Sequence, residues 1–184
     1  MRFNLGAALR NLLGVGMRPQ EENDGEVPSI VLLLRESRVT SLEDLRLAST
    51  RAFGVGFSSD ITDRFYLIQK VLFTIIKVGP HVLSFMHYAK PYGEERTAEF
   101  LSTMSSPKQQ RAWTGHTAWE AVNYVKSKGN LNREYAVLAR LCAELVNENC
   151  VGAWIPQGPM MIPNDGSLTR YLEQVGSSSD GLHE

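Results

Sequence analysis

The side chains in this sequence that could bind a ligand or move a proton gather around one histidine and one glutamate. His116 and Glu120 are four residues apart, so they share a face in a strand and in a helix alike. An imidazole beside a carboxylate can hold a polar ligand or take part in acid–base chemistry. Trp113 and Trp154 lie near predicted turns, where an indole can line a groove. These four residues are the candidate binding site, and the pattern assigns no catalytic residue.

Each of the four residues also fits an ordinary structural role. Glu120 suits a solvated edge of a sheet, and most tryptophans at such positions pack in a core or at its rim. An acid–base role therefore requires that His116, Glu120 and a tryptophan converge in one enclosed pocket.

The sequence contains none of the common motifs that bind phosphate or activate a nucleophile. Gly54-Val55-Gly56 lacks the third glycine of a dinucleotide-binding loop, and it follows a predicted helix where that loop follows a strand. There is no Gly-Lys-Ser or Gly-Lys-Thr, no G-x-S-x-G and no His-Glu-x-x-His. The glycine pair is therefore interpreted as a turn.

Histidine and cysteine spacing predicts neither a metal site nor a cofactor. His81 and His87 are six residues apart, which in a strand separates them by about 20 Å. Cys142 lies within the apolar stripe of a predicted helix, and Cys150 begins a strand after the carboxyl end of that helix. Both positions raise the pKa of a thiol, so a cysteine nucleophile is not expected.

Composition excludes several classes of protein. The chain has 184 residues, 43% of them hydrophobic and 21% charged, with a net charge of −1, which is typical of one globular domain. A near-neutral chain has no overall field that attracts nucleic acid, so no nucleic-acid partner is predicted. Two cysteines make no disulfide framework. No apolar run is long enough for a transmembrane segment, and we expect a soluble, cytoplasmic protein.

Local composition divides the chain into three parts: a flexible leader over 1–27, one domain over 28–175 and a disordered tail over 176–184. The first 18 residues contain three arginines, no acid and one apolar stripe at helical spacing. This segment offers weak contact with a membrane surface or a partner. Met17 is an alternative start to Met1, and an acidic linker follows it.

The pattern of apolar residues divides the middle of the chain into strands and helices. The order β-α-β-β-α-β-α-β-α predicts an α+β fold, with a mainly antiparallel sheet and helices packed on one face. The predicted strands cover 30–34, 66–78, 82–89 and 150–155, and the predicted helices cover 41–53, 98–106, 132–146 and 167–175, with a loop over 157–166.

The first predicted helix carries signals at both of its ends. Ser41 with Asp44, or Thr40 with Glu43, offers the pair of side chains that caps backbone N–H groups at a helix start. Gly54 ends the helix, as a glycine just past the last turn often does.

The segment 113–128 fits a helix and a strand equally well. A helix places Ala118, Ala121 and Val125 on one face. A strand instead places Trp119 and Ala121 on one face and Glu120 on the other. Periodicity alone leaves both possibilities open.

Four features together resemble an uncharacterised bacterial α+β family, a domain of unknown function. They are the strand 30–34 with the helix after it, the stretch from Trp113 to His116, the helix 135–146, and Gly152-Ala153-Trp154. The resemblance covers most of residues 29–172 and implies that 117–126 is a strand. His116 and Trp154 match its pattern, the continuation after Pro156 does not align with it, and it implies no activity.

These observations predict a binding module, non-catalytic, whose partner is an unknown protein or a small ligand. The alternative is a small enzyme with a polar pocket around His116 and Glu120. Convergence of those side chains in one pocket would favour the enzyme. Side chains that point to different faces would exclude it.

Overall fold

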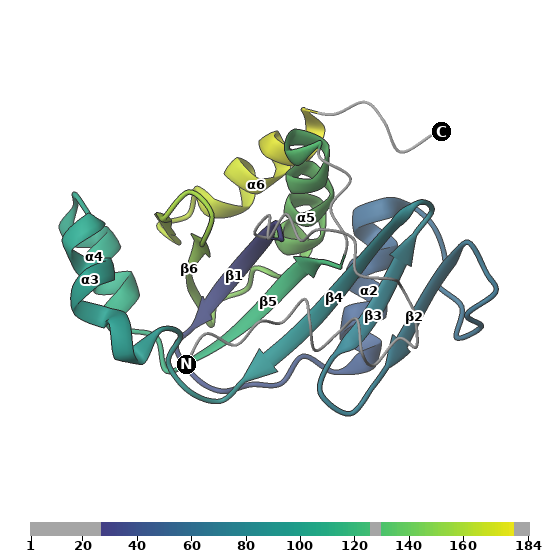
Figure 1. Cartoon of the computed structure of the whole chain (residues 1–184), viewed down its shortest axis with the longest axis horizontal. Coiled ribbons are helices and arrows are strands. Elements are labelled where there is room, and N and C mark those ends of the chain that lie inside the picture. Colours follow the sequence, from purple (N-terminus) through teal and green to yellow (C-terminus); the bar gives the residue numbers. More distant parts are fainter. Residues whose placement is uncertain (1–26, 126–129, 179–184) are drawn as a thin grey trace, which may run out of the picture.

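The computed structural model describes residues 27–125 and 130–178 (Figure 1). The arginine-containing segment 1–18, the linker up to residue 26 and the tail from residue 179 lie outside the described residues. The predictions made for these segments lie outside them as well. Among the described residues, no helix is both long enough and apolar enough to cross a membrane.

The described chain forms one seven-stranded sheet in the order β2-β3-β4-β5-β1-β6-β7, and every neighbouring pair is antiparallel. The α+β class and the antiparallel sheet predicted from the sequence are confirmed. The strands are β1 (Ser29–Leu34), β2 (Phe65–Gln69), β3 (Thr74–Val78), β4 (His81–Tyr88), β5 (Ala118–Tyr124), β6 (Cys150–Ile155) and β7 (Met160–Pro163). The helices are α2 (Leu42–Phe53), the short turn η1 (Glu94–Arg96), α3 (Thr97–Thr103), α4 (Pro107–Thr114), α5 (Leu131–Leu145) and α6 (Leu168–Ser177).

The strand β1 is the centre of the fold. It pairs with β5 on one side and with β6 on the other, and all six of its residues are buried. Because successive side chains of a strand point to opposite faces, Ile30 and Leu32 enter one core while Val31 and Leu33 enter another. The unbroken apolar run therefore reflects helices on both sides of this strand.

The larger core lies under α2, α5 and α6. Leu45 of α2, Leu138 of α5 and Leu172 of α6 pack in one cluster with the β1 residues Ile30 and Leu32. Helices α2 and α5 cover this face of the sheet directly, and α6 packs along α5 (Figure 1). The sequence predicted helices on one face of the sheet, and this layer is the larger of the two that the described residues form.

A second, smaller layer covers part of the opposite face, and the sequence analysis did not predict it. Phe100 of α3 and Trp113 of α4 pack against Val31, Leu33 and Trp154. Figure 1 shows α3 and α4 together at one end of the sheet, away from α2 and α5.

Two elements differ from the prediction because their local signals are ambiguous. The run 66–78 divides into β2 and β3 at a tight turn in which the N–H of Lys70 donates to the carbonyl of Phe73 at 2.8 Å. Val71 is 99% exposed there, so its β-branched side chain belongs to the turn and not to a strand face. The predicted loop 157–166 contains the edge strand β7.

Proline and glycine positions account for two further differences. Pro107 starts α4 at its first turn, where a missing N–H costs nothing, and Ser106 with Gln109 completes a capping box before it. The helix α6 continues to Ser177, past residue 175, because the carbonyl of Gly176 accepts a bond from Arg140 Nε at 2.7 Å.

The segment that the periodicity left open is a strand. Residues Ala118–Tyr124 form β5 between β4 and β1. Of the two possible caps of α2, Ser41 forms the bond, since its Oγ accepts from the N–H of Asp44 at 3.1 Å. Gly54 follows the helix in the left-handed conformation (φ 67°), as the sequence predicted.

Candidate functional site

The two predicted tryptophans lie in the core of the second face. Trp113 and Trp154 are each 1% exposed, and their ring centroids are 5.1 Å apart. The ring of Phe100 packs edge-on against Trp113 at 4.9 Å. Because both indoles are enclosed by other aromatic rings, they stabilise the fold and do not line a groove open to solvent.

His116 lies beside these tryptophans with both ring nitrogens bonded. Nδ1 donates to the carbonyl oxygen of Trp113, and Nε2 accepts from the N–H of Tyr92 at 2.8 Å. These bonds select the neutral ring with its proton on Nδ1. Burial lowers the pKa of His116, and that effect exceeds the opposing effect of the two backbone bonds. His116 therefore connects the end of α4 to the loop at Tyr92 as a neutral side chain.

Glu120 lies on the opposite face of the sheet from His116. It shares a face of β5 with Ala118, Val122 and Tyr124, which belong to the larger core under α2 and α5. His116 precedes β5, so the alternation of a strand does not extend to it. The structure thus brings Trp113, Trp154 and His116 together and separates Glu120 from all three.

The partners of Glu120 come from two distant segments. Its Oε1 accepts a bond from the N–H of Thr40 at 3.2 Å and from Thr40 Oγ1 at 2.6 Å. His87 stands directly opposite Glu120 on β4, and its Nδ1 lies 3.4 Å from the same oxygen. Glu120 is 2% exposed. Burial raises the pKa of its carboxyl, and the bonds from Thr40 and the proximity of His87 offset only part of this rise.

The connection between β1 and α2 brings these partners over the sheet. After Leu34 the chain turns away from β1. Ser37 then contacts His87 of β4, and Thr40 contacts Glu120 of β5 just before α2 begins. Asn149 anchors the start of this crossing, since its side chain bonds to both the N–H and the carbonyl of Glu36 at 2.9 and 2.8 Å.

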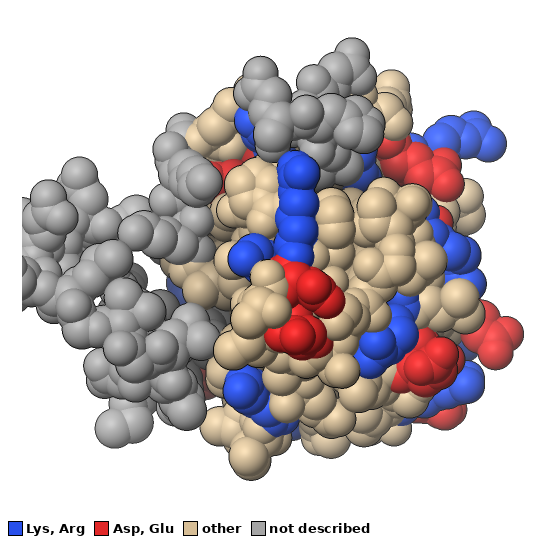
Figure 2. Space-filling model, turned by 90° about the vertical axis from the view of Figure 1, so that its right-hand side faces the viewer, with Lys and Arg blue, Asp and Glu red and all other residues tan. Residues whose placement is uncertain are grey.

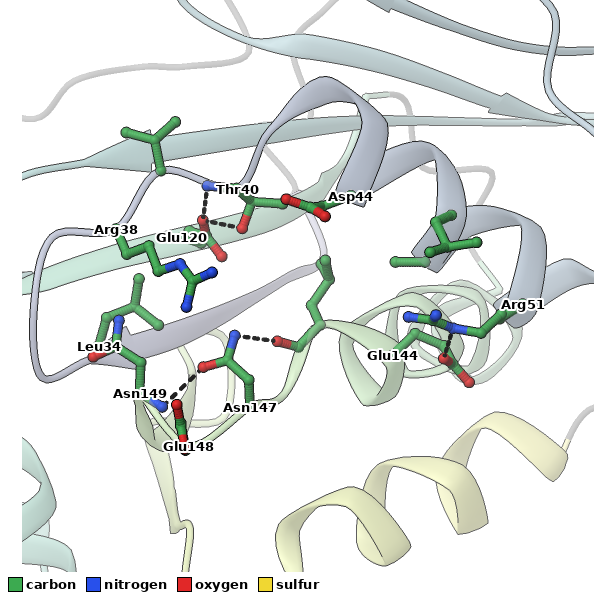
Figure 3. A pocket seen from close by; sticks show the side chains of 14 residues that line it. Leu34, Arg38, Thr40, Asp44, Arg51, Glu120, Glu144, Asn147, Glu148 and Asn149 are labelled. Carbon is green, nitrogen blue, oxygen red and sulfur yellow. Dashed lines mark hydrogen bonds and ion pairs between the residues drawn. The ribbon is translucent and has the colours of Figure 1, made fainter.

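A cavity of about 390 Å³ opens beside this connection, with Glu120 at its base (Figure 3). We call it the Glu120 pocket, and its size lies within the range of small-molecule sites. It is bounded by the β1–α2 connection, by α2, and by the end of α5 with the loop after it. The lining residues are Leu34, Arg38, Val39, Thr40, Asp44, Leu47, Ala48, Arg51, Glu120, Glu144, Leu145, Asn147, Glu148 and Asn149.

The charged side chains of the Glu120 pocket fall into paired and unpaired groups. Arg51 Nε binds Glu144 Oε2 at 2.8 Å, and Asp44 accepts a bond from Ser41. Arg38 and Glu148 make no ion pair within residues 27–125 and 130–178. Figure 3 shows the Arg38 guanidinium directed toward the middle of the pocket, so this cation can meet a ligand. Among the described residues, Glu148 and Asp44 are carboxylates of the pocket without an ion pair, and Asp44 is held by the Ser41 hydroxyl.

Two apolar side chains of the pocket are also exposed. Val39 is 68% exposed and Leu47 is 51% exposed, although both are large and apolar. A ligand that covers them gains the free energy of removing apolar surface from water.

Figure 2 shows how charged side chains are distributed on one further face of the molecule. On the face shown in Figure 2, the Lys and Arg side chains are interspersed with Asp and Glu, and no broad field of one sign is present. Interspersed charges of both signs do not favour the sequence-independent attraction that nucleic acid requires.

The cysteines and the potential metal ligands fit structural roles. Burial raises the pKa of Cys142 and raises that of Cys150 to about 12, as their positions in the sequence predicted. In the part of the chain that the structure describes, no three His, Cys, Asp or Glu side chains lie together as a metal site.

Sequence patterns did not identify His87, Thr40 and Arg38 as residues of the candidate site. His87 was considered only with His81 as a metal ligand, and Thr40 only as a helix cap. Glu120 alone carried a signal in the sequence, because it is the one charged residue of the segment Ala118–Tyr124. Comparison of the chain with protein-family models, curated proteins and solved structures finds no match.

Proposed function

We propose that this chain is a binding module that holds a small zwitterionic molecule, of the size of an amino acid or a dipeptide, in the Glu120 pocket. One observation carries the proposal. The pocket combines an unpaired guanidinium (Arg38), an unpaired carboxylate (Glu148) and two exposed apolar side chains (Val39 and Leu47).

Each part of such a ligand has a partner of the right chemistry. A guanidinium binds a carboxylate through two parallel N–H bonds, so Arg38 would hold the acid group. Glu148 would hold the ammonium group, and an aliphatic side chain would cover Val39 and Leu47. Binding requires no chemical step.

The alternative of a small enzyme built around His116 and Glu120 is not part of this proposal. His116 and Glu120 lie on opposite faces of the sheet, and both nitrogens of His116 already have partners. No substrate contacts both side chains at once.

Calorimetric titration with three related probes tests the proposal. Leucine carries both charges, N-acetyl-leucine lacks the cation, and leucinamide lacks the anion. We expect leucine to bind most tightly, with a Kd of about 1 mM or below. Arg38→Gln should weaken binding of leucine and N-acetyl-leucine by about tenfold, and Glu148→Gln should weaken leucine and leucinamide.

The matched control is Arg170→Gln, which removes an exposed charge on α6, outside the pocket. It should bind all three probes as the unchanged protein does. Absence of saturable binding of leucine, or an equal effect of the Arg38 and Arg170 substitutions, would overturn the proposal.

We further propose that the protein works in the cytoplasm. Both described cysteines are free thiols, which is typical of a reducing compartment. The relation to the bacterial family of unknown function stays a proposal, and it supplies no ligand.

A further inference from the structure

We propose that Ser37, His87 and Glu120 form a nucleophile relay that hydrolyses small carboxylic esters at the surface of the β1–α2 connection. Ser37 Oγ lies 3.2 Å from His87 Nε2, and His87 Nδ1 lies 3.4 Å from Glu120 Oε1. Hydroxyl, imidazole and carboxylate thus stand in the order of a serine hydrolase, on three separate segments of the chain.

The burial of the three groups matches their proposed roles. Glu120 is buried, the side chain of His87 is 12% exposed, and Ser37 is exposed. A substrate can reach the exposed hydroxyl of Ser37. The electrostatic interaction between the buried carboxylate and the imidazole stays strong, because water does not screen it. Thr40 holds Glu120 Oε1 with two bonds, so the carboxylate is fixed before any substrate arrives.

One unsatisfied atom supports this interpretation. His87 Nδ1 is buried and makes no hydrogen bond within the described residues, although Glu120 Oε1 is near. A buried ring N–H without a partner is costly. Nδ1 lies 3.4 Å from Glu120 Oε1, and catalytic contacts that are long in a free enzyme commonly tighten when substrate binds.

The reaction needs no group beyond these residues and water. Ser37 Oγ attacks the ester carbonyl carbon, and its proton passes to His87 Nε2. The tetrahedral intermediate then breaks its bond to the alkoxide, which leaves with that proton as an alcohol. Water attacks the acyl-serine by the same route, releasing the carboxylic acid and restoring Ser37.

Two features stabilise the charges that form during these steps. The carboxylate of Glu120 faces the imidazolium formed on His87. The N–H of Ser37 donates to no acceptor in the described part of the chain, so it can bond to the developing oxyanion. Glu120 lines the Glu120 pocket, whereas Ser37 and His87 do not. Labelling of Ser37 can therefore be tested separately from binding of the proposed amino-acid ligand.

Labelling with a fluorophosphonate, followed by intact-mass and peptide mass spectrometry, tests the nucleophile. We expect one adduct per chain, on Ser37, and none in Ser37→Ala. His87→Gln should slow labelling by about 100-fold, because it removes the general base. Ser105→Ala, which changes another exposed serine on the opposite side of the sheet, should react as the unchanged protein does.

The pH dependence of p-nitrophenyl acetate hydrolysis tests the positioning role of Glu120. Glu120→Gln should lower the rate and displace the pH profile, since the imidazolium loses its counter-charge. Circular dichroism and thermal unfolding of each variant check that it folds, and leucine binding by Ser37→Ala should be unchanged.

Labelling that does not reach Ser37, or that proceeds equally in His87→Gln, would contradict the relay. An unmoved pH profile in a folded Glu120→Gln protein would also contradict it. Failure of leucine to bind, with Ser37 still labelled, would contradict only the binding proposal.

Discussion

The two faces of the sheet bury a histidine and a glutamate in contrasting ways. On the face under α3 and α4, His116 has a partner at each ring nitrogen and lies among aromatic rings. On the face under α2 and α5, Glu120 shares one oxygen between Thr40 and His87, and it lies at the base of a cavity.

This difference separates structural polar groups from those that can act. A buried polar group with all its bonds made stabilises one conformation and has nothing left to offer a ligand. A buried group with incomplete bonding beside a cavity keeps the capacity to respond. For this reason the binding and the hydrolysis that we propose both use the α2 and α5 face.

The largest expected effect is at the aromatic core of the second face. Trp113→Ala removes a side chain that is 1% exposed and should lower the free energy of unfolding by about 3–5 kcal/mol. Urea denaturation followed by circular dichroism measures this change. A loss below about 1 kcal/mol would show that the α3 and α4 layer does not contribute a packed core.

The larger core provides the matching test. Leu138→Ala on α5 removes a fully buried side chain and should cost about 2–5 kcal/mol. The same urea titration applies. A cost below about 1 kcal/mol would mean that this face of α5 is not part of the core. The layer of α3 and α4 would then contribute more to stability than the layer of α2 and α5.

Glu120 should make stability fall as pH rises. Its pKa is raised in the folded state, so the folded protein holds the proton where the unfolded chain has lost it. The favourable contribution is complete below the ordinary value of 4.5 and is lost as pH rises through the folded pKa. Urea titrations between pH 4 and 8 should show this fall relative to Glu120→Gln.

His116 should change the pH dependence of stability in the opposite direction to Glu120, and by a smaller amount. Its pKa is lowered in the folded state, so its contribution is complete above the ordinary value of 6.5 and is lost as pH falls through the folded pKa. The advantage of the unchanged protein over His116→Gln should shrink on acidification. If both variants changed with pH in the same direction, the contrast between the two faces would be wrong.

Local patterns predicted the elements whose signals are unambiguous. The apolar run of β1, the capped amphipathic α2 and the long α5 follow directly from side-chain spacing. The turn between β2 and β3 was missed because it contains no glycine or proline, and α4 was missed because Pro107 was interpreted as the end of a helix.

The candidate site was predicted only in part. Glu120 belongs to the candidate site, but its partners are His87, 33 positions earlier, and Thr40, 80 positions earlier. His116 was chosen for its spacing from Glu120, and it failed because the strand begins two residues after it.

The sequence by itself determined the strands and helices whose periodicity is unambiguous, and which of their side chains share a face, because these properties depend on periods of two and 3.6 residues. The tertiary structure decided that β5 lies between β4 and β1, and with that register it placed His87 opposite Glu120. Strand order results from packing the whole sheet against its two helical layers. No short segment of the chain contains that information.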